Sequence, residues 1–136
     1  MALALVPLRS EATPKSMAKA MLQAYGKRTL NSGRVSLKVP ALAESGHSVS
    51  LRVSADSPMQ EDSYVRRIDL YSEANPLPVI ARFELSPLSG LAEVHTRVRL
   101  ADSQTLTAVA EYSDGSLWLA STKTIVTLAA CTDFLI

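Results

Sequence analysis

Hydrophobic and polar side chains alternate at a period of two along most of the chain after Gly33. The alternation occupies 35–39, 49–55, 65–72, 79–85, 92–100 and 105–112. Two further apolar runs follow at 117–121 and 124–130, and Asp114-Gly115 before the first of them is a strong hairpin signal. Short strands separated by turn residues, with no helical pattern between them, are typical of antiparallel sandwiches. The pattern therefore predicts an all-β, immunoglobulin-like antiparallel β-sandwich.

The residues before Gly33 follow a helical period instead. Thr13 suits the N-cap position, Pro14 suits the first helical position, and Gly26 is a natural C-terminal stop. Apolar side chains recur between these signals at steps of three and four, at Met17, Ala18, Met21, Leu22 and Tyr25. We expect a helix whose apolar stripe packs on the body of this chain or on a neighbouring subunit.

These patterns divide the chain into four segments. Residues 1–12 are expected to be a disordered lead or the remnant of a signal peptide, and 13–33 the N-terminal helix and its linker. Residues 34–128 form the predicted sandwich. Residues 129–136 form a predicted C-terminal arm, which holds the single cysteine, Cys131.

Composition excludes several classes of function. A chain of 136 residues has room for one domain with its own core. A net charge of +1 and 5% aromatic residues argue against nucleic acid as a partner. No apolar run approaches the roughly 20 residues of a membrane span. One cysteine excludes an internal disulfide and a cysteine-rich zinc site, and no other pattern indicates a metal or cofactor.

Cys131 is the strongest candidate for chemistry. A thiolate is a far better nucleophile than a hydroxyl, and terminal segments tend to be mobile, so a cysteine beyond the last strand can act as a group carried on an arm. The competing interpretation is a small, inert hydrophobe packed with its apolar neighbours. A thiol enzyme acting alone would need a nearby base, and the two histidines, His47 and His95, are expected on the surface in segments unlinked to the arm.

Basic residues form a second pattern. Arg97 and Arg99 alternate along one predicted strand, and Arg66 and Arg67 lie on another. Such residues usually mark the water-facing side of a strand, and they also protect a sheet edge against aggregation. An anion-attracting role is the alternative.

Several segments together resemble the SoxY family of sulfur-carrier proteins. They are 39–46, the Asp56-Ser57-Pro58-Met59 turn, Asn75-Pro76-Leu77-Pro78, 92–101 and 109–118. The likeness runs from about Gly33 to Cys131. It implies an immunoglobulin-like sandwich and a non-enzymatic carrier subunit that pairs with a SoxZ-like subunit in the periplasm. It also implies that Cys131 holds the substrate covalently. A haem enzyme joins thiosulfate to this cysteine oxidatively, and a hydrolase then releases sulfate.

The sequence departs from this family in the arm. The carrier cysteine of the family lies in Gly-Gly-Cys-Gly-Gly, whereas here Ala129, Ala130, Thr132 and Asp133 surround Cys131. These residues make a stiffer and bulkier arm than glycine does, and a nearby Asp133 would raise the pKa of the thiol. We expect a SoxY-related carrier with an Ala-Ala-Cys arm. Without a SoxZ-like partner, an exposed thiol could instead link two copies through a disulfide. The alternative function is a non-catalytic binding or structural sandwich with an inert cysteine.

Overall fold

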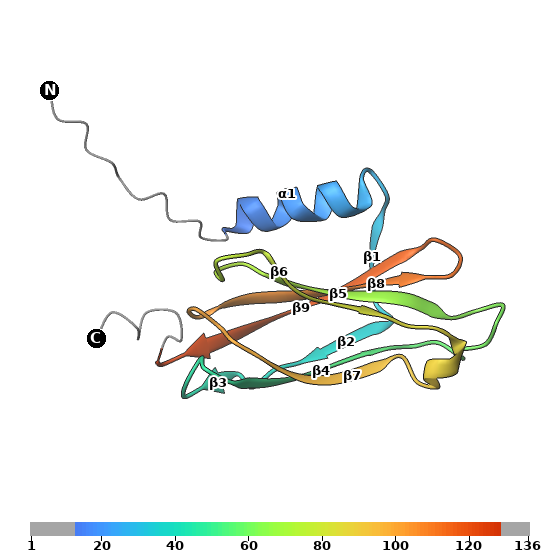
Figure 1. The fold of residues 1–136 in the computed structure, drawn as a ribbon. Helices are drawn as coiled ribbons and strands as arrows, with labels where there is room; N and C mark the ends of the chain where they lie inside the picture. Colours follow the sequence, from blue (N-terminus) through green and yellow to red (C-terminus); the bar gives the residue numbers. More distant parts are fainter. Residues whose placement is uncertain (1–12, 129–136) are drawn as a thin grey trace, which may run out of the picture.

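The computed structural model describes residues 13–128, which form one helix lying on a two-layered β-sandwich (Figure 1). The elements are α1 (Pro14–Tyr25), β1 (Leu30–Ser32), β2 (Val35–Lys38), β3 (Leu42–Ala43), β4 (Val49–Ala55), β5 (Val65–Ser72), β6 (Val79–Glu84), the 3₁₀ turn η1 (Pro87–Ser89), β7 (Glu93–Val98), β8 (Gln104–Tyr112) and β9 (Leu117–Val126).

The larger sheet has the strand order β1-β9-β8-β5-β6, and β3 also pairs with β9, farther along that strand than β1 does. The smaller sheet has the order β2-β4-β7. The long neighbours β4/β7, β5/β6, β5/β8 and β8/β9 are all antiparallel. The predicted immunoglobulin-like antiparallel sandwich with an N-terminal helix is therefore confirmed.

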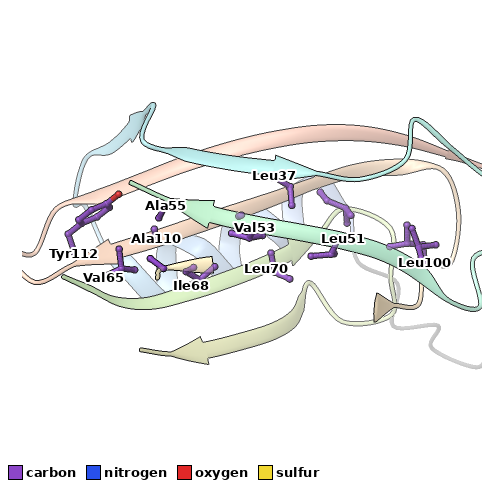
Figure 2. Close-up of a cluster of buried hydrophobic side chains, with 14 of the residues drawn as sticks. Leu37, Leu51, Val53, Ala55, Val65, Ile68, Leu70, Leu100, Ala110 and Tyr112 are labelled. Atoms are coloured by element: carbon purple, nitrogen blue, oxygen red, sulfur yellow. The ribbon is translucent and has the colours of Figure 1, made fainter. Parts of the chain in front are cut away.

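The core lies between the two sheets and is filled by the inward-facing residues of the alternating strands. Figure 2 shows Leu51 and Val53 of β4 facing Ile68 and Leu70 of β5 across this space. All four side chains are at most 2% exposed. Because their neighbours in sequence point the other way, the period of two identified the inward face of both sheets.

Helix α1 lies on the outward face of the larger sheet. The Thr13 hydroxyl accepts the amide of Ser16 at 3.1 Å, so the predicted N-cap is confirmed. The apolar stripe is rotated from the predicted one. Ala18 and Leu22 face solvent. Ala20 and Ala24 take their place beside Met17 and Met21 against the sheet. The side chains that contact the second core cluster from α1 are Met17, Ala20, Met21, Ala24 and Tyr25.

A buried polar network fixes the end of this helix. The Tyr25 hydroxyl donates to Asp69 of β5 at 2.5 Å and accepts from the Tyr71 hydroxyl at 3.0 Å. Asp69 is 1% exposed and also accepts from Arg67 at 3.1 Å and from Arg82 at 2.8 Å. The carboxylate is thus desolvated but surrounded by donors, which is the condition for tolerating a buried charge. Burial, together with the hydrogen bond to Asp69, raises the pKa of Tyr25 far above its usual value.

This raised pKa predicts a loss of stability at alkaline pH. The unfolded Tyr25 phenol ionises near pH ~10 while the folded one stays protonated, so its contribution is complete below that pH and falls as pH rises above it. We expect the stability difference between the wild type and Tyr25→Phe to shrink by about 1.4 kcal/mol per pH unit above 10. Urea unfolding at pH 8, 10 and 11 measures it. Tyr64→Phe, at a half-buried ring outside the network, should retain the wild-type slope.

The prediction was wrong about the last strands. The two runs 117–121 and 124–130 were expected as separate strands, but Leu117–Val126 forms one continuous strand, β9. The short strands β1 and β3 lie where the sequence shows no alternation, and both are paired parallel to β9. Each is only two or three residues long and has too few positions for a periodic signal.

Trp118 of β9 packs against the main core cluster. The side chain is half-buried, and the guanidinium of Arg34 lies 4.6 Å from its ring centroid. The same guanidinium is 5.4 Å from the ring of Tyr112. Arg34 therefore covers the aromatic end of the sandwich through cation–π contacts.

Candidate functional site

The predicted site residues Ala129, Ala130, Cys131, Thr132 and Asp133 lie outside the described residues. What the structure describes is the root of the predicted arm, which is the end of β9 and the two residues after it, Thr127 and Leu128. The site must therefore be built from the elements that hold this root in place.

Backbone hydrogen bonds from the 41–46 segment hold the root along its whole length. The amide of Ile125 donates to the Ala41 carbonyl at 2.9 Å, and the amide of Thr127 donates to the Ala43 carbonyl at 3.1 Å. The amide of Gly46 then donates to the carbonyl of Leu128 at 2.8 Å. The chain is thus bonded to its neighbours up to the last described residue.

Side chains reinforce the same anchor from both sides. The Thr127 hydroxyl donates to the Glu44 carbonyl at 2.7 Å, and the Thr124 hydroxyl donates to the Pro40 carbonyl at 2.7 Å. On the opposite side, the Ser103 hydroxyl accepts the amide of Val126 at 2.8 Å. The arm consequently begins from a rigid point rather than from a fraying strand end.

The surface at the root is apolar. Leu42 and Ile125 are directly paired across β3 and β9, and they are 57% and 58% exposed. Leu128 is 52% exposed. Exposed apolar side chains gathered at one place mark a surface suited to contact with another protein. Sequence patterning could not find this group, because Leu42 lies outside the segments with alternating hydrophobic and polar side chains.

One histidine belongs to the same neighbourhood. His47 follows Gly46, whose amide donates to the carbonyl of Leu128, so the segment that holds His47 lies beside the root of the predicted arm. The Nδ1 atom of His47 lies 2.8 Å from the Ser45 hydroxyl. His95 lies on β7, exposed, with Nε2 2.7 Å from the carboxylate of Glu93. This contact identifies His95 as part of a surface ion-pair group.

The arginines of the two predicted basic strands are on different sheets. Arg66 and Arg67 belong to β5, where Arg66 donates to the Ser113 carbonyl at 2.7 Å and Arg67 to Asp69. Arg97 belongs to β7 in the smaller sheet, and Arg99 follows that strand. The four guanidinium groups therefore do not form one anion site, and Arg67 is part of the network under α1.

The described residues offer no metal centre. Within 13–128, no group of three or more His, Cys, Asp and Glu side chains is placed to hold a metal ion. No helix in the same range is long and apolar enough to cross a membrane.

Comparison with known proteins identifies the family. The profile of the family described as "Sulfur oxidation protein SoxY" matches residues 21–131. The chain belongs to the SoxY family. No curated protein matches it with a significant score. Among solved structures, it is similar to the sulfur carrier protein SoxY from Chlorobium limicola f thiosulfatophilum, with 25% identity and a TM-score of 0.70. That match covers 85% of this chain and 100% of the other.

More distant similarities concern the fold alone. The superoxide reductase (neelaredoxin) from Ignicoccus hospitalis is 21% identical with a TM-score of 0.61, and the match covers 85% of this chain and 94% of the other. A superoxide reductase-like protein from Thermotoga maritima is 18% identical, with a TM-score of 0.59 and coverage of 77% and 96%. The SoxY sandwich is therefore shared with proteins of another function.

Membership of the SoxY family gives the chain a role as a carrier in sulfur oxidation, in a family that works in the periplasm. The match also extends over the arm root and the first residues of the arm. Its last position is Cys131, the only cysteine of the sequence. The family match therefore includes the residue that sequence analysis singled out for its thiol.

Proposed function

We propose that this SoxY protein carries sulfur-oxidation intermediates as covalent adducts on Cys131. The observation that supports the proposal most directly is that the family match ends at the single cysteine, three residues beyond Leu128, whose carbonyl is hydrogen-bonded to Gly46. The sandwich presents the thiol at this position. Separate enzymes carry out the reactions that load and release the sulfur adduct. Ala129, Ala130, Thr132 and Asp133 form the arm around it.

The loading step joins two sulfur atoms. The Cys131 thiolate and the outer sulfur of thiosulfate form a disulfide-type bond, which gives Cys–S–S–SO₃⁻ and releases two electrons. A separate haem enzyme accepts these electrons. In the next step, water attacks the terminal sulfur in a hydrolase, which gives sulfate, two protons and a persulfide, Cys–S–S⁻. The carrier contributes the thiolate and its presentation, and it needs no cofactor of its own.

The partners proposed for this chain follow from the same role. A SoxZ-like subunit pairs with the sandwich to form a heterodimer in the periplasm, and the haem enzyme and the hydrolase bind transiently. Without the SoxZ-like subunit, Cys131 of two copies would form a disulfide-linked homodimer. Because alanines and a threonine bend less freely than glycines, the arm fits enzymes with a wider entrance than a Gly-Gly-Cys-Gly-Gly arm requires.

Mass spectrometry of the protein isolated from thiosulfate-grown cells of its native host tests this proposal. We expect a sulfonate or persulfide adduct on the peptide that contains Cys131, removable by a reducing agent. In the reduced, folded protein, a maleimide should label the thiol as fast as a free thiol. An unmodified Cys131 that labels only after unfolding would contradict the proposal and favour an inert cysteine.

A further inference from the structure

The outward face of the smaller sheet carries a strong excess of positive charge. Its side chains come from β2, β4 and β7, from the residue before β4 and from the residue after β7. They comprise the cations Lys38, Arg52, Arg97 and Arg99, the imidazole of His95, the carboxylate of Glu93, and the serines Ser36, Ser48, Ser50 and Ser54. We call this set the basic face. Four formal positive charges stand against one negative charge there, although the whole chain has a net charge of +1.

The sheet register places these cations beside one another. Lys38 is directly opposite Arg52, and Arg52 is directly opposite His95. Like charges directly across a sheet repel each other and destabilise it. Ser50 lies opposite Arg97 in the next row. Because this arrangement lowers the stability of the fold, we infer that the cations bind a negatively charged partner.

Glu93 is the single carboxylate on the basic face and is already engaged. It lies 2.8 Å from the Nε atom of Arg52 and 2.7 Å from the Nε2 atom of His95. The hydrogen bond from His95 lowers the pKa of Glu93, with a smaller contribution from Arg52. Among the described residues, no carboxylate forms an ion pair with Lys38, Arg97 or Arg99. These three cations remain available to a partner.

The basic face ends at the root of the arm. Arg97 donates to the Ser48 hydroxyl at 3.2 Å, at the start of β4. Arg99 precedes Leu100, whose amide donates to the Gly46 carbonyl at 2.8 Å, and the Gly46 amide in turn bonds Leu128. In Figure 1, β4 and β7 form the lower layer. An enzyme that takes up Cys131, three residues after Leu128, must approach this end of the sandwich.

We propose that the basic face docks an acidic protein surface beside the active-site entrance of the enzymes that act on Cys131. This inference rests on the proposed carrier function. The serines are small and leave the cations projecting from a flat surface, which suits a broad protein contact. A shallow depression of about 410 Å³, lined by Lys38, Val39, Pro40, Ser50, Leu51, Arg52 and His95, is open enough to receive a carboxylate side chain of that partner.

The charge distribution favours a protein over a small free anion. The cations are spread over three strands, which lie roughly 5 Å apart, rather than converging on one point. Glu93, at the start of the edge strand β7, also lies beside Arg52 and His95 and would repel a free oxoanion at that end of the face. Charges of this kind chiefly accelerate encounter with an oppositely charged protein, and their effect weakens as salt rises.

The test compares two double variants that each change the net charge by the same amount. Lys38→Glu/Arg97→Glu reverses two cations of the basic face. Lys27→Glu/Lys123→Glu reverses two exposed cations elsewhere on the chain and is the matched control. All four side chains are exposed, so both variants should fold, which circular dichroism verifies. The measurement is the second-order rate of Cys131 loading by the thiosulfate-oxidising haem enzyme of the same host, followed by mass spectrometry.

At low ionic strength, we expect the basic-face variant to load at least about 10-fold more slowly than the wild type, and the control variant to change by less than about 3-fold. The difference should largely vanish in about 0.5 M sodium chloride. Equal slowing of both variants, or of neither, would overturn the docking proposal. So would inhibition by sulfate beyond that of chloride at equal ionic strength, because it would indicate a small-anion site. A wild type that is not loaded at all would instead contradict the carrier function itself, on which the docking depends.

Discussion

Replacement of Cys131 by serine is expected to abolish adduct formation. A serine hydroxyl at neutral pH is almost entirely protonated and is a poor nucleophile toward sulfur, whereas a thiol is partly ionised and attacks sulfur readily. Cys131→Ser removes one sulfur atom and leaves residues 13–128 unchanged. The variant should unfold with the wild-type midpoint, yet incubation with thiosulfate and the haem enzyme should give no mass shift.

Ala130→Ser is the matched control, because it introduces the same hydroxymethyl group one residue upstream and keeps the thiol. It should load at nearly the wild-type rate. If Cys131→Ser still acquired a sulfur adduct, the carrier group would have to be another atom. If Ala130→Ser failed as completely as Cys131→Ser, the arm rather than the thiol would be the sensitive feature.

The second large effect is expected in the network beneath α1. Asp69→Ala removes the buried acceptor shared by Tyr25, Arg67 and Arg82. The Tyr25 hydroxyl then loses its main partner in a buried position. Removing one member of a buried charged group costs ~3–5 kcal/mol. Arg82 is 46% exposed and can turn toward water, so we expect a loss near ~3 kcal/mol, measured by urea unfolding.

Asp62→Ala is the control for this prediction. Asp62 lies in an exposed turn and should change the free energy of unfolding by less than ~0.5 kcal/mol. Since Tyr25 ends α1, loss of Asp69 should also loosen the helix and accelerate proteolysis at the 26–29 connection. A loss of stability below about 1 kcal/mol, with unchanged proteolysis, would show that packing alone holds the helix.

The alternation of hydrophobic and polar side chains predicted much of the sandwich. It could not predict which residues on the outward face of the larger sheet are buried. The alternation over 65–72 places Ile68 and Leu70 inward and therefore places Asp69 on the outward face. It does point outward, but α1 covers that face and buries it. A period of two reports which side of a sheet a residue occupies. It carries no information on which side a distant helix will cover.

The functional region was predictable only in part, for a related reason. Cys131 could be singled out from the sequence because it is the single cysteine and follows the last strand, and its role stays a prediction. The neighbours of the root could not be found, because Leu42 and His47 reach it through parallel pairing across about 80 residues of sequence. Short parallel pairings leave no local signal in the sequence, whereas the turn residues of a hairpin can be recognised in it.

The anchoring of Leu128 limits how far Cys131 can extend from the sandwich. Strand β9 is paired with β8 on one side and with β3 on the other. The segment between the sandwich and Cys131 therefore cannot lengthen unless both pairings break. Three further residues span at most roughly 11 Å when fully extended. Under the proposed function, every enzyme that acts on Cys131 must therefore keep its reacting centre within that depth of its own surface, plus the length of the cysteine side chain and its adduct.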